Sequence, residues 1–319
     1  MAKTILKRLL QTIPVLFVVV TLTFILTRMI PGNPAMQMLG PQASPDAIAT
    51  LEEEMGLNRP MLEQYVEYLL GLFQGDFGYS YTYSGPVLPV ILERLPATLS
   101  ITLTSLVIAL VLGVVIGVES AVHQNTWFDY VFMVLALVGV SMPIFWLALM
   151  LVLTFSVNLG WLPAIGIGSW SDGLWDVVSH MILPVTCLAT IPAATFARIT
   201  RSSVLETIGG EYIKALRSRG IRESVVVWKH AFKNALPPIV TVLGLQLAGA
   251  FAGAILTESI FSWPGIGTLI VNSVNSRDYA LIQGIVLFSA VVFVFVNLVV
   301  DVVYTIINPK VSYEGGSEA

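Results

Sequence analysis

The sequence has little charge, since only 11% of its 319 residues are Asp, Glu, Lys or Arg, whereas 56% are hydrophobic. A soluble domain carries about a quarter charged residues, so this chain cannot cover a water-facing surface of its size. The composition excludes an ordinary soluble globular protein and indicates an integral membrane protein.

Cysteine and histidine are also scarce. The single cysteine, Cys187, excludes a disulfide or a cysteine-based metal site within one chain, and its apolar surroundings indicate a small buried side chain. The three histidines, His123, His180 and His230, are far apart and lack ligand spacing such as His-Glu-x-x-His. We therefore predict no metal site.

Catalytic and nucleotide-binding motifs are missing. The sequence holds neither a Gly-x-Ser-x-Gly nucleophile elbow nor a Gly-x-x-x-x-Gly-Lys-Ser/Thr phosphate loop, so we expect no enzyme activity and no cofactor on this chain. Ionisable residues inside the apolar segments would mark a proton or ion path. The main candidate is Asp301, which shares a helix face with Asn297 and Tyr304, and pairing with basic residues nearby is the alternative explanation. This scarcity favours an external energy source.

Six segments have the roughly 20 apolar residues that a helix needs to cross a bilayer. They are residues 9–30, 97–122, 131–157, 180–199, 236–257 and 281–307. The first lacks a small-residue cleavage site, so we interpret it as a retained span and not as a signal peptide. The fourth contains Pro184 and Pro192, which predict a kinked helix that faces protein. The fold expected is all-α and polytopic, with six transmembrane helices.

Positive charge sets the predicted orientation. With the N-terminus inside, twelve Lys and Arg residues face the cytoplasm and four face outward, so both termini are predicted to be cytoplasmic. Four parts follow from this topology. They are the N-terminal tail with the first helix (1–30), an extracytoplasmic helical region (31–95), a membrane core of the other five spans (96–307) that includes a cytoplasmic loop (198–235), and a cytoplasmic tail (308–319).

The extracytoplasmic region is predicted to be folded. Ser44-Pro45-Asp46 is typical of a helix N-terminus, with a serine cap and proline at the first helical position. A second helix is expected after Pro60, since apolar residues then recur at helical spacing. They are Leu62, Tyr65, Val66, Leu69, Leu70 and Phe73. This stripe either packs on the membrane face of the same protein or forms an exposed docking platform for an extracytoplasmic partner.

The segment from Arg198 to Lys233 holds eight of the sixteen Lys and Arg residues. Its charge alone fits an orientation signal or a surface for anionic lipid, and we expect no nucleic acid beside a membrane. The order of helix-forming residues and glycine in this segment indicates more than its charge does. A helix is predicted from Glu206 to Arg219, Gly220 stops it, and Glu223 to Asn234 resumes it. A short helix that breaks at a glycine suits a lever pushed by a partner protein.

The same segment carries a family resemblance. Tyr212-Ile-Lys-Ala-Leu-Arg-Ser-Arg-Gly220, followed by Lys229-His-Ala-Phe-Lys-Asn-Ala-Leu236, resembles the cytoplasmic coupling loop of ABC importer permeases in its peptide-transport form. Further landmarks of that family follow in order along the chain. They are Lys7-Arg-Leu-Leu-x-x-Ile-Pro14, Ile30-Pro-Gly-Asn-Pro34, Gly75-Asp-Phe-Gly78, Arg94-Leu-Pro-Ala-Thr98, Gly160-Trp-Leu-Pro163, Phe261-Ser-Trp-Pro-Gly-Ile-Gly267, Arg277-Asp-Tyr279, Asn297-Leu-Val-Val-Asp301 and Asn308-Pro-Lys310.

The sequence departs from the family pattern at a few places. Lys214-Ala-Leu stands where the general signature begins Glu-Ala-Ala, and Pro237 comes later than the proline that usually closes the loop. Asn33 and Asn308 stand where aspartate is usual. These differences narrow the subfamily to the first of the two paired permeases in dipeptide, oligopeptide, glutathione or nickel importers.

The resemblance implies a set of partners in the bacterial cytoplasmic (inner) membrane. The chain would form a heterodimer with a homologous second permease, and bind two cytoplasmic ATPase subunits that hold ATP and Mg. An extracytoplasmic binding protein would deliver the substrate, and alternating access would move it across the membrane. The coupling residues implied are Tyr212, Lys214, Ala215, Arg217, Arg219 and Gly220, and the arginines would meet acidic groups on the ATPase.

Two further sets of residues are predicted as site residues. Ser141, Thr241 and Gln246 are candidates for the translocation path, with interhelical hydrogen bonding as the alternative for Gln246. Small residues around Gly244, Gly249 and Gly253 favour close packing, so we expect the fifth span to be central. Trp263, Pro264, Arg277 and Asp278 are candidates for an extracytoplasmic gate or receptor contact, and an interfacial tryptophan anchor is the alternative for Trp263.

Two other classes of protein fit less well. An ion-coupled secondary carrier would need coupling ions and usually internal repeats, and neither is evident. A membrane-embedded enzyme would need a catalytic constellation, which is missing.

Overall fold

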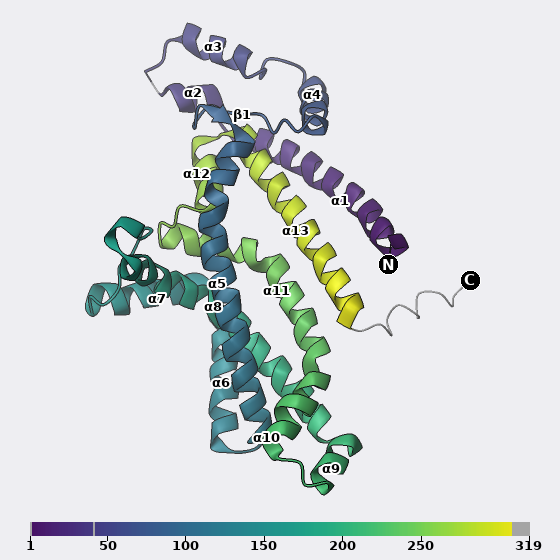
Figure 1. Ribbon diagram of the computed structural model, residues 1–319. Helices are drawn as coiled ribbons and strands as arrows, with labels where there is room; N and C mark the ends of the chain where they lie inside the picture. The colour runs from purple at the N-terminus through teal and green to yellow at the C-terminus, as the bar shows by residue number, and fades with distance from the viewer. Residues whose placement is uncertain (1, 41, 308–319) are drawn as a thin grey trace. The chain divides into compact units, whose positions relative to one another are not determined.

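The computed structural model describes residues 2–40 and 42–307, without side-chain detail for 2–9, 37, 251–253 and 301–307. Figure 1 shows a helical chain in which two short strands form a small hairpin. The helices and strands are α1 (Ala2–Met29), α2 (Pro34–Leu39), α3 (Pro45–Glu54), α4 (Met61–Phe73), β1 (Tyr79–Ser80), β2 (Gly85–Pro86), α5 (Val87–Val122), α6 (Trp127–Ser141), α7 (Ile144–Leu151), the π-helical η1 (Val152–Asn158), the 3₁₀ turn η2 (Trp170–Asp172), α8 (Leu174–Ile208), α9 (Glu211–Ser218), α10 (Glu223–Val225), the π-helical η3 (Val226–Ala231), α11 (Phe232–Ile260), α12 (Ile266–Ser276) and α13 (Tyr279–Ile307).

Four helices in the described part of the chain are long and apolar enough to cross a membrane, and up to six spans result if two bent helix pairs each count as one. The pair Trp127–Ser141 and Ile144–Asn158 is bent by 106°. The predicted span 131–157 is therefore not one straight helix. Pro143 explains the break, because it lacks an amide hydrogen and disfavours helical geometry in the residue before it.

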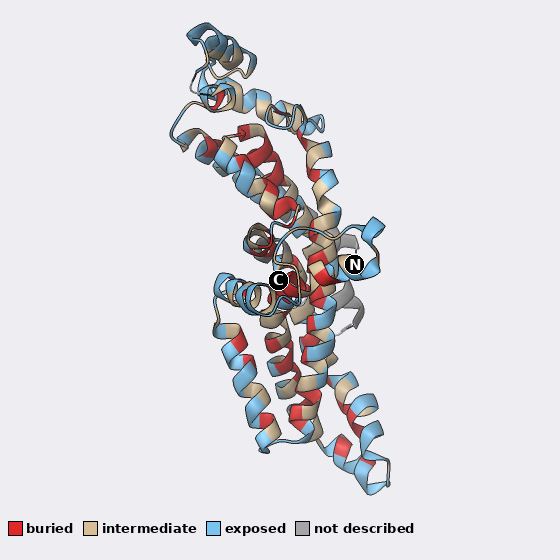
Figure 2. Cartoon of the chain, turned by 90° about the vertical axis from the view of Figure 1, so that its left-hand side faces the viewer, coloured by how far each residue is buried: buried red, intermediate tan, exposed pale blue. Residues whose placement is uncertain are grey.

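The chain divides into two compact units. The first unit comprises Leu99–Ser262 and the chain from Phe295 onward, and the second comprises Ala2–Thr98 and Trp263–Val294. In Figure 2 the buried positions form stripes along the helices, and exposed positions lie between them. This is the pattern of long helices that each pack on one face.

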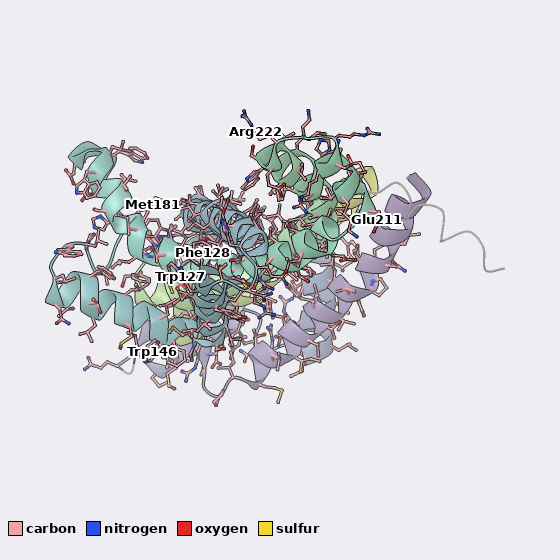
Figure 3. The ribbon with its side chains drawn as sticks, turned by 90° about the horizontal axis from the view of Figure 1, so that it is seen from below. Trp127, Phe128, Trp146, Met181, Glu211 and Arg222 are labelled. Carbon is pink, nitrogen blue, oxygen red and sulfur yellow. The ribbon has the colours of Figure 1, made fainter. Side chains whose placement is uncertain are left out.

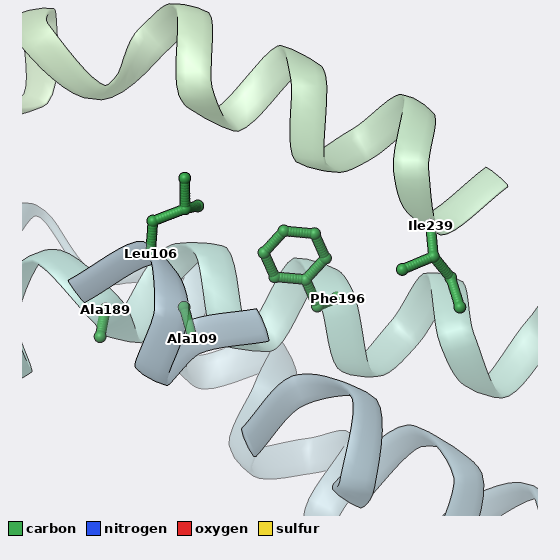
Figure 4. Close-up of a cluster of buried hydrophobic side chains, with 5 residues drawn as sticks. All are labelled: Leu106, Ala109, Ala189, Phe196 and Ile239. Atoms are coloured by element: carbon green, nitrogen blue, oxygen red, sulfur yellow. The ribbon is translucent and has the colours of Figure 1, made fainter. Parts of the chain in front are cut away.

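Helix α8 organises the first unit. It packs against α6, α7 and α11, and its 35 residues correspond to about 52 Å, well beyond the roughly 30 Å hydrocarbon thickness. Phe196 on α8 is fully buried between Leu106 of α5 and Ile239 of α11 (Figure 4). The predicted span 180–199, interrupted by prolines, is thus part of a continuous and well-packed helix.

Glycines allow α5 and α8 to pack closely. A Cβ at Gly113 would lie 2.5 Å from the Cβ of Phe196, and a Cβ at Gly117 would lie 2.6 Å from the carbonyl oxygen of Ala197. These glycines form a Gly-x-x-x-Gly pattern, which brings two backbones together. On α11, Gly244 packs against Val300, but a Cβ at Gly249 would meet nothing within 4 Å. The small-residue contact expected along the fifth span is therefore only partly made within this chain.

The second unit joins landmarks that lie far apart in the sequence. The indole Nε1 of Trp263 donates to the carbonyl of Ala97 at 2.8 Å, and the amide of Ile266 donates to Thr98 Oγ1 at 2.8 Å. Gly32, at φ +110°, leaves room for the guanidinium of Arg277, whose Cζ would lie 2.7 Å from a Cβ at that position. Four family landmarks thus serve to hold this unit together.

Candidate functional site

Helix α9 is separated from α8 by two glycines. α8 ends at Ile208, Gly210 caps α9 in an extended conformation (ψ 151°), and α9 runs from Glu211 to Ser218. The continuous helix predicted from Glu206 to Arg219 is therefore wrong. Glycine has low helix propensity, so adjacent Gly209 and Gly210 favour a break that lets α9 turn away from α8.

The apolar side of α9 binds the start of the next membrane helix. Ile213 and Leu216 are buried in a cluster with Val226 and Ala231 of η3. The hydroxyl of Tyr212 also lies 2.8 Å from Nδ1 of His230, within hydrogen-bond distance. Because η3 continues directly into α11, a displacement of α9 would reach α11 without an intervening loop.

Gly220 makes the turn after α9. Its φ of +70° lies in the left-handed region, which glycine adopts without a steric penalty. The amide of Gly220 donates to the carbonyl of Arg217 at 2.9 Å and that of Ile221 to Leu216 at 3.4 Å, so the turn satisfies the last carbonyls of the helix. The predicted stop at Gly220 is confirmed.

An ion pair closes this turn. Arg217 donates from Nε and Nη2 to the two carboxylate oxygens of Glu223, at 3.1 and 2.5 Å. The hydrogen bonds hold the pKa of the Glu223 carboxyl below its usual range and raise the pKa of Arg217. We expected Arg217 to meet an acidic group on a partner, but its guanidinium pairs with Glu223 of the same chain.

Other side chains of the segment remain exposed. Tyr212 is 53% exposed and Lys214 pairs with Glu211 at 2.8 Å, whereas Ala215 and Arg219 face solvent. Figure 3 shows Arg222 at the outer edge of the segment, with nitrogen-tipped side chains that point away from the helices. Among the described residues, neither Arg219 nor Arg222 forms an ion pair. These arginines present positive charge outward.

A buried ion pair holds α6 to α8. Arg201 Nε and Nη2 each lie 2.6 Å from a carboxylate oxygen of Asp129, whose side chain is 2% exposed. Asp129 also accepts from the amide of Asn125 at 3.1 Å. The sequence analysis missed this pair. The sequence does hold two signals for it. Asp129 lies in the first helical turn after Thr126, and Arg201 lies near the start of the segment from Arg198 to Lys233.

The three predicted pathway residues differ in exposure. Ser141 is exposed at the end of α6, where its hydroxyl donates to the carbonyl of Leu137. Thr241 is exposed on α11 and donates to the carbonyl of Pro237. Gln246 is half-buried five residues later, and therefore points about 140° away from Thr241 around the helix. Ser141 and Thr241 are thus the more exposed of the three.

The predicted gate residues are largely internal. Trp263 and Asp278 are each 1% exposed, so neither side chain offers a surface to a receptor or, for Trp263, to the membrane interface. Asp278 accepts from Ser80 Oγ at 2.6 Å and from the amide of Leu281 at 3.1 Å, which caps α13. Pro264 and Arg277 are half-buried. These residues stabilise the second unit.

Residue Asp301 lies where side chains are not described, and Asn308 and Lys310 lie outside the described residues.

Comparison with known families identifies the family of this chain. Residues 109–313 match the profile of the family described as binding-protein-dependent transport system inner membrane component, and residues 1–102 match its N-terminal profile. The chain belongs to this family. It is an inner-membrane permease component of an ATP-binding cassette transporter, and is not itself an enzyme.

Relatives cover nearly the whole permease. The chain is 46% identical to the dipeptide transport system permease protein DppB of Alkalihalophilus pseudofirmus, over 96% of this chain and 98% of the relative. It is 41% identical to a putative peptide transport system permease of Brucella suis and to the glutathione transport system permease protein GsiC of Salmonella choleraesuis, over 98% of this chain and the whole of each relative.

A solved structure supports the fold of the permease. The MetNI methionine ABC transporter, in inward-facing conformations, aligns with a TM-score of 0.54 at 17% identity, over 69% of this chain and 96% of the transporter chain. At this identity the likeness concerns the fold alone.

Proposed function

We propose that the segment from Arg198 to Lys233 couples ATP hydrolysis on partner subunits to movement of the membrane helices. The observation that carries this proposal is the two-sided character of α9. One side is fixed to η3 through Ile213 and Leu216, and the other side is exposed beside the outward-facing charges of Arg219 and Arg222.

The proposed mechanism follows from this attachment. Closure of two ATPase subunits upon ATP binding displaces α9, and the glycines on either side, Gly210 and Gly220, act as hinges. Because η3 continues into α11, the displacement tilts α11 and changes access to the substrate path. ATP binding can shift this equilibrium only if the ATPases bind the two conformations with different affinity.

The proposed assembly is a heterodimer with a second, homologous permease, in a topology of six spans with both termini in the cytoplasm. The exposed face of α11 supports a partner helix there. Thr241, Leu245 and Gly249 follow one another at i, i+4 and i+8; Leu245 is 65% exposed and the Gly249 face is empty within this chain. An apolar helix face that includes a glycine suits close packing against another membrane helix.

The proposed substrate is a peptide, delivered by an extracytoplasmic binding protein. Support comes from the names of the relatives, since two of the three quoted are peptide or dipeptide permeases. Glutathione is the second candidate, because a glutathione permease is 41% identical. A reconstituted transporter supplied with dipeptide, oligopeptide, glutathione or a nickel chelate would distinguish these substrates.

The coupling role is tested by Gly220→Pro, which cannot adopt the observed φ of +70°. We expect loss of substrate-stimulated ATP hydrolysis in proteoliposomes, with membrane insertion and basal subunit assembly retained. Gly160→Pro is the matched control, since Gly160 also has a left-handed φ of +63° in open space but lies outside the segment from Arg198 to Lys233. Unchanged stimulation in the Gly220 variant would contradict the coupling role.

A further inference from the structure

Helix α4 presents two apolar sides, and only one of them is covered. Tyr65, Tyr68 and Leu72 are partly or largely buried, whereas Leu62 is 74% and Phe73 88% exposed. The exposed set is Leu62, Val66, Leu70 and Phe73. At 100° per residue these four side chains occupy an arc of about 80° that adjoins the buried side.

The buried side of α4 fixes its position on α1. Rings of Tyr65 and Tyr68 lie 5.1 and 6.0 Å from that of Phe24, and the hydroxyl of Tyr65 lies 2.6 Å from that of Thr21. Arg28 donates to Gln64 Oε1 at 3.0 Å. Burial raises the pKa of Tyr68 to about 12, as expected for a phenol removed from water.

These contacts also fix the depth of α4. The apolar span of α1 runs from Leu10 to Met29, and its 20 residues match the roughly 30 Å hydrocarbon thickness. Phe24 and Thr21 are five and eight residues before Met29, which places them about 8 and 12 Å inside that end of the span. The Tyr65 hydroxyl therefore lies at the depth of lipid acyl chains.

The polar side of α4 points the opposite way. Glu63, Glu67 and Gln74 are exposed, and they lie around the helix opposite Tyr65. Arg59 pairs with Glu67 at 2.8 Å on this side. A helix with its charges opposite a membrane-deep tyrosine has the geometry of an amphipathic helix lying in the membrane interface.

We propose that α4 is a membrane-interface helix whose uncovered apolar side, Leu62, Val66, Leu70 and Phe73, is inserted among the lipids beside α1. The lipid is favoured as occupant because the apolar side continues without interruption from the surface that α1, a membrane span, already covers. Helix α4 would then anchor the region between α1 and α5 at a fixed height above the bilayer.

Site-directed fluorescence in proteoliposomes tests this proposal. Single cysteines would replace Leu62 or Phe73, the exposed apolar residues nearest the buried side, in the complete transporter. Glu67→Cys on the polar side and Gln74→Cys directly after the helix are the controls. Each would carry a polarity-sensitive fluorophore, and the labelled parent complex would give the background. Native Cys187 is buried and does not compete for the label.

Brominated phospholipid is expected to quench the labels at 62 and 73 several-fold more strongly than those at 67 and 74. A water-soluble iodide quencher should give the reverse order, and addition of the binding protein should change neither. Iodide quenching at 73 that equals quenching at 67 and is lost when the binding protein is added would overturn the proposal in favour of a receptor contact. Protection at 73 from both quenchers would overturn it in favour of a partner subunit.

Discussion

Two segments that look alike as family landmarks have opposite structural roles. The segment from Tyr212 to Gly220 exposes Tyr212, Ala215 and Arg219 to solvent and fixes only its apolar side. The segment from Trp263 to Tyr279 instead buries its distinctive side chains, including Trp263 and Asp278. The difference teaches that, in this chain, the charged landmark flanked by glycines stays exposed, whereas the aromatic landmark is an internal brace.

The largest effect is expected when the internal brace is broken. Trp263→Ala removes a fully buried indole and leaves the carbonyl of Ala97 without its donor, so we expect a loss of about 3–5 kcal/mol of stability and poor assembly. Thermal denaturation in detergent measures this loss. Trp170→Ala, at a 75% exposed position, serves as the control. A stable Trp263 variant with a specific defect in substrate release would instead restore the gate role.

Loss of the Asp129 carboxylate should have the next largest effect. Asp129→Ala leaves Arg201 without its partner in a mostly buried place, and breaking such a pair costs about 3 kcal/mol. The melting temperature of the purified complex would report the change. Lys233→Ala, which removes an exposed charge, should leave it unaltered. If Asp129→Ala matched the parent protein, the pair would contribute nothing to the attachment of α6 to α8.

A smaller effect on stability, with a larger one on coupling, is expected for Gly220→Ala. A left-handed φ of +70° costs a residue with a Cβ about 1 kcal/mol. The substitution should reduce substrate-stimulated ATP hydrolysis more than it reduces thermal stability. If stimulated ATP hydrolysis and thermal stability fall equally, or if neither falls, Gly220 has no specific role in coupling. The segment from Tyr212 to Gly220 would then be a structural element like the segment from Trp263 to Tyr279.

The smallest effect on stability is expected for Glu223→Gln, because both partners of this pair are substantially exposed. The lowered pKa of Glu223 means that the pair is complete above the ordinary carboxyl range and is lost only as pH falls through that lowered value. Coupled ATP hydrolysis should therefore be insensitive to Glu223 titration near neutral pH. In Glu223→Gln, Arg217 is released, and its cross-linking to the ATPase should increase.

Much of the fold follows from the sequence. Apolar length predicted the helices that carry the spans, and the glycine at 220 and the proline at 60 correctly marked where a helix ends or begins. Hydropathy could not separate lipid-facing from protein-facing positions, because both are apolar. The pattern favoured α11 for close small-residue packing and did not single out Gly113 and Gly117 of α5, which pack closely against α8.

The remaining differences come from side-chain contacts that a linear pattern does not show. Tryptophan is typical of an interfacial anchor, but Trp263 is buried and donates to the carbonyl of Ala97, 166 residues earlier. Arg217 and Arg219 are equivalent in a linear pattern, but the turn at Gly220 brings Glu223 to Arg217 alone. The sequence around Pro143 does not say whether the proline kinks one helix or breaks it into two, because packing against neighbouring helices decides between these geometries.

Photo-cross-linking from residue 219 in the assembled transporter tests the coupling role of α9 most directly. A photoreactive amino acid at Arg219 should form a cross-link to an ATPase subunit, and its yield should change when ATP is added. The same probe at Trp170 should give no ATPase product. A probe at residue 219 that reacts only with lipid or with the second permease would contradict the proposal that α9 is where the ATPases attach.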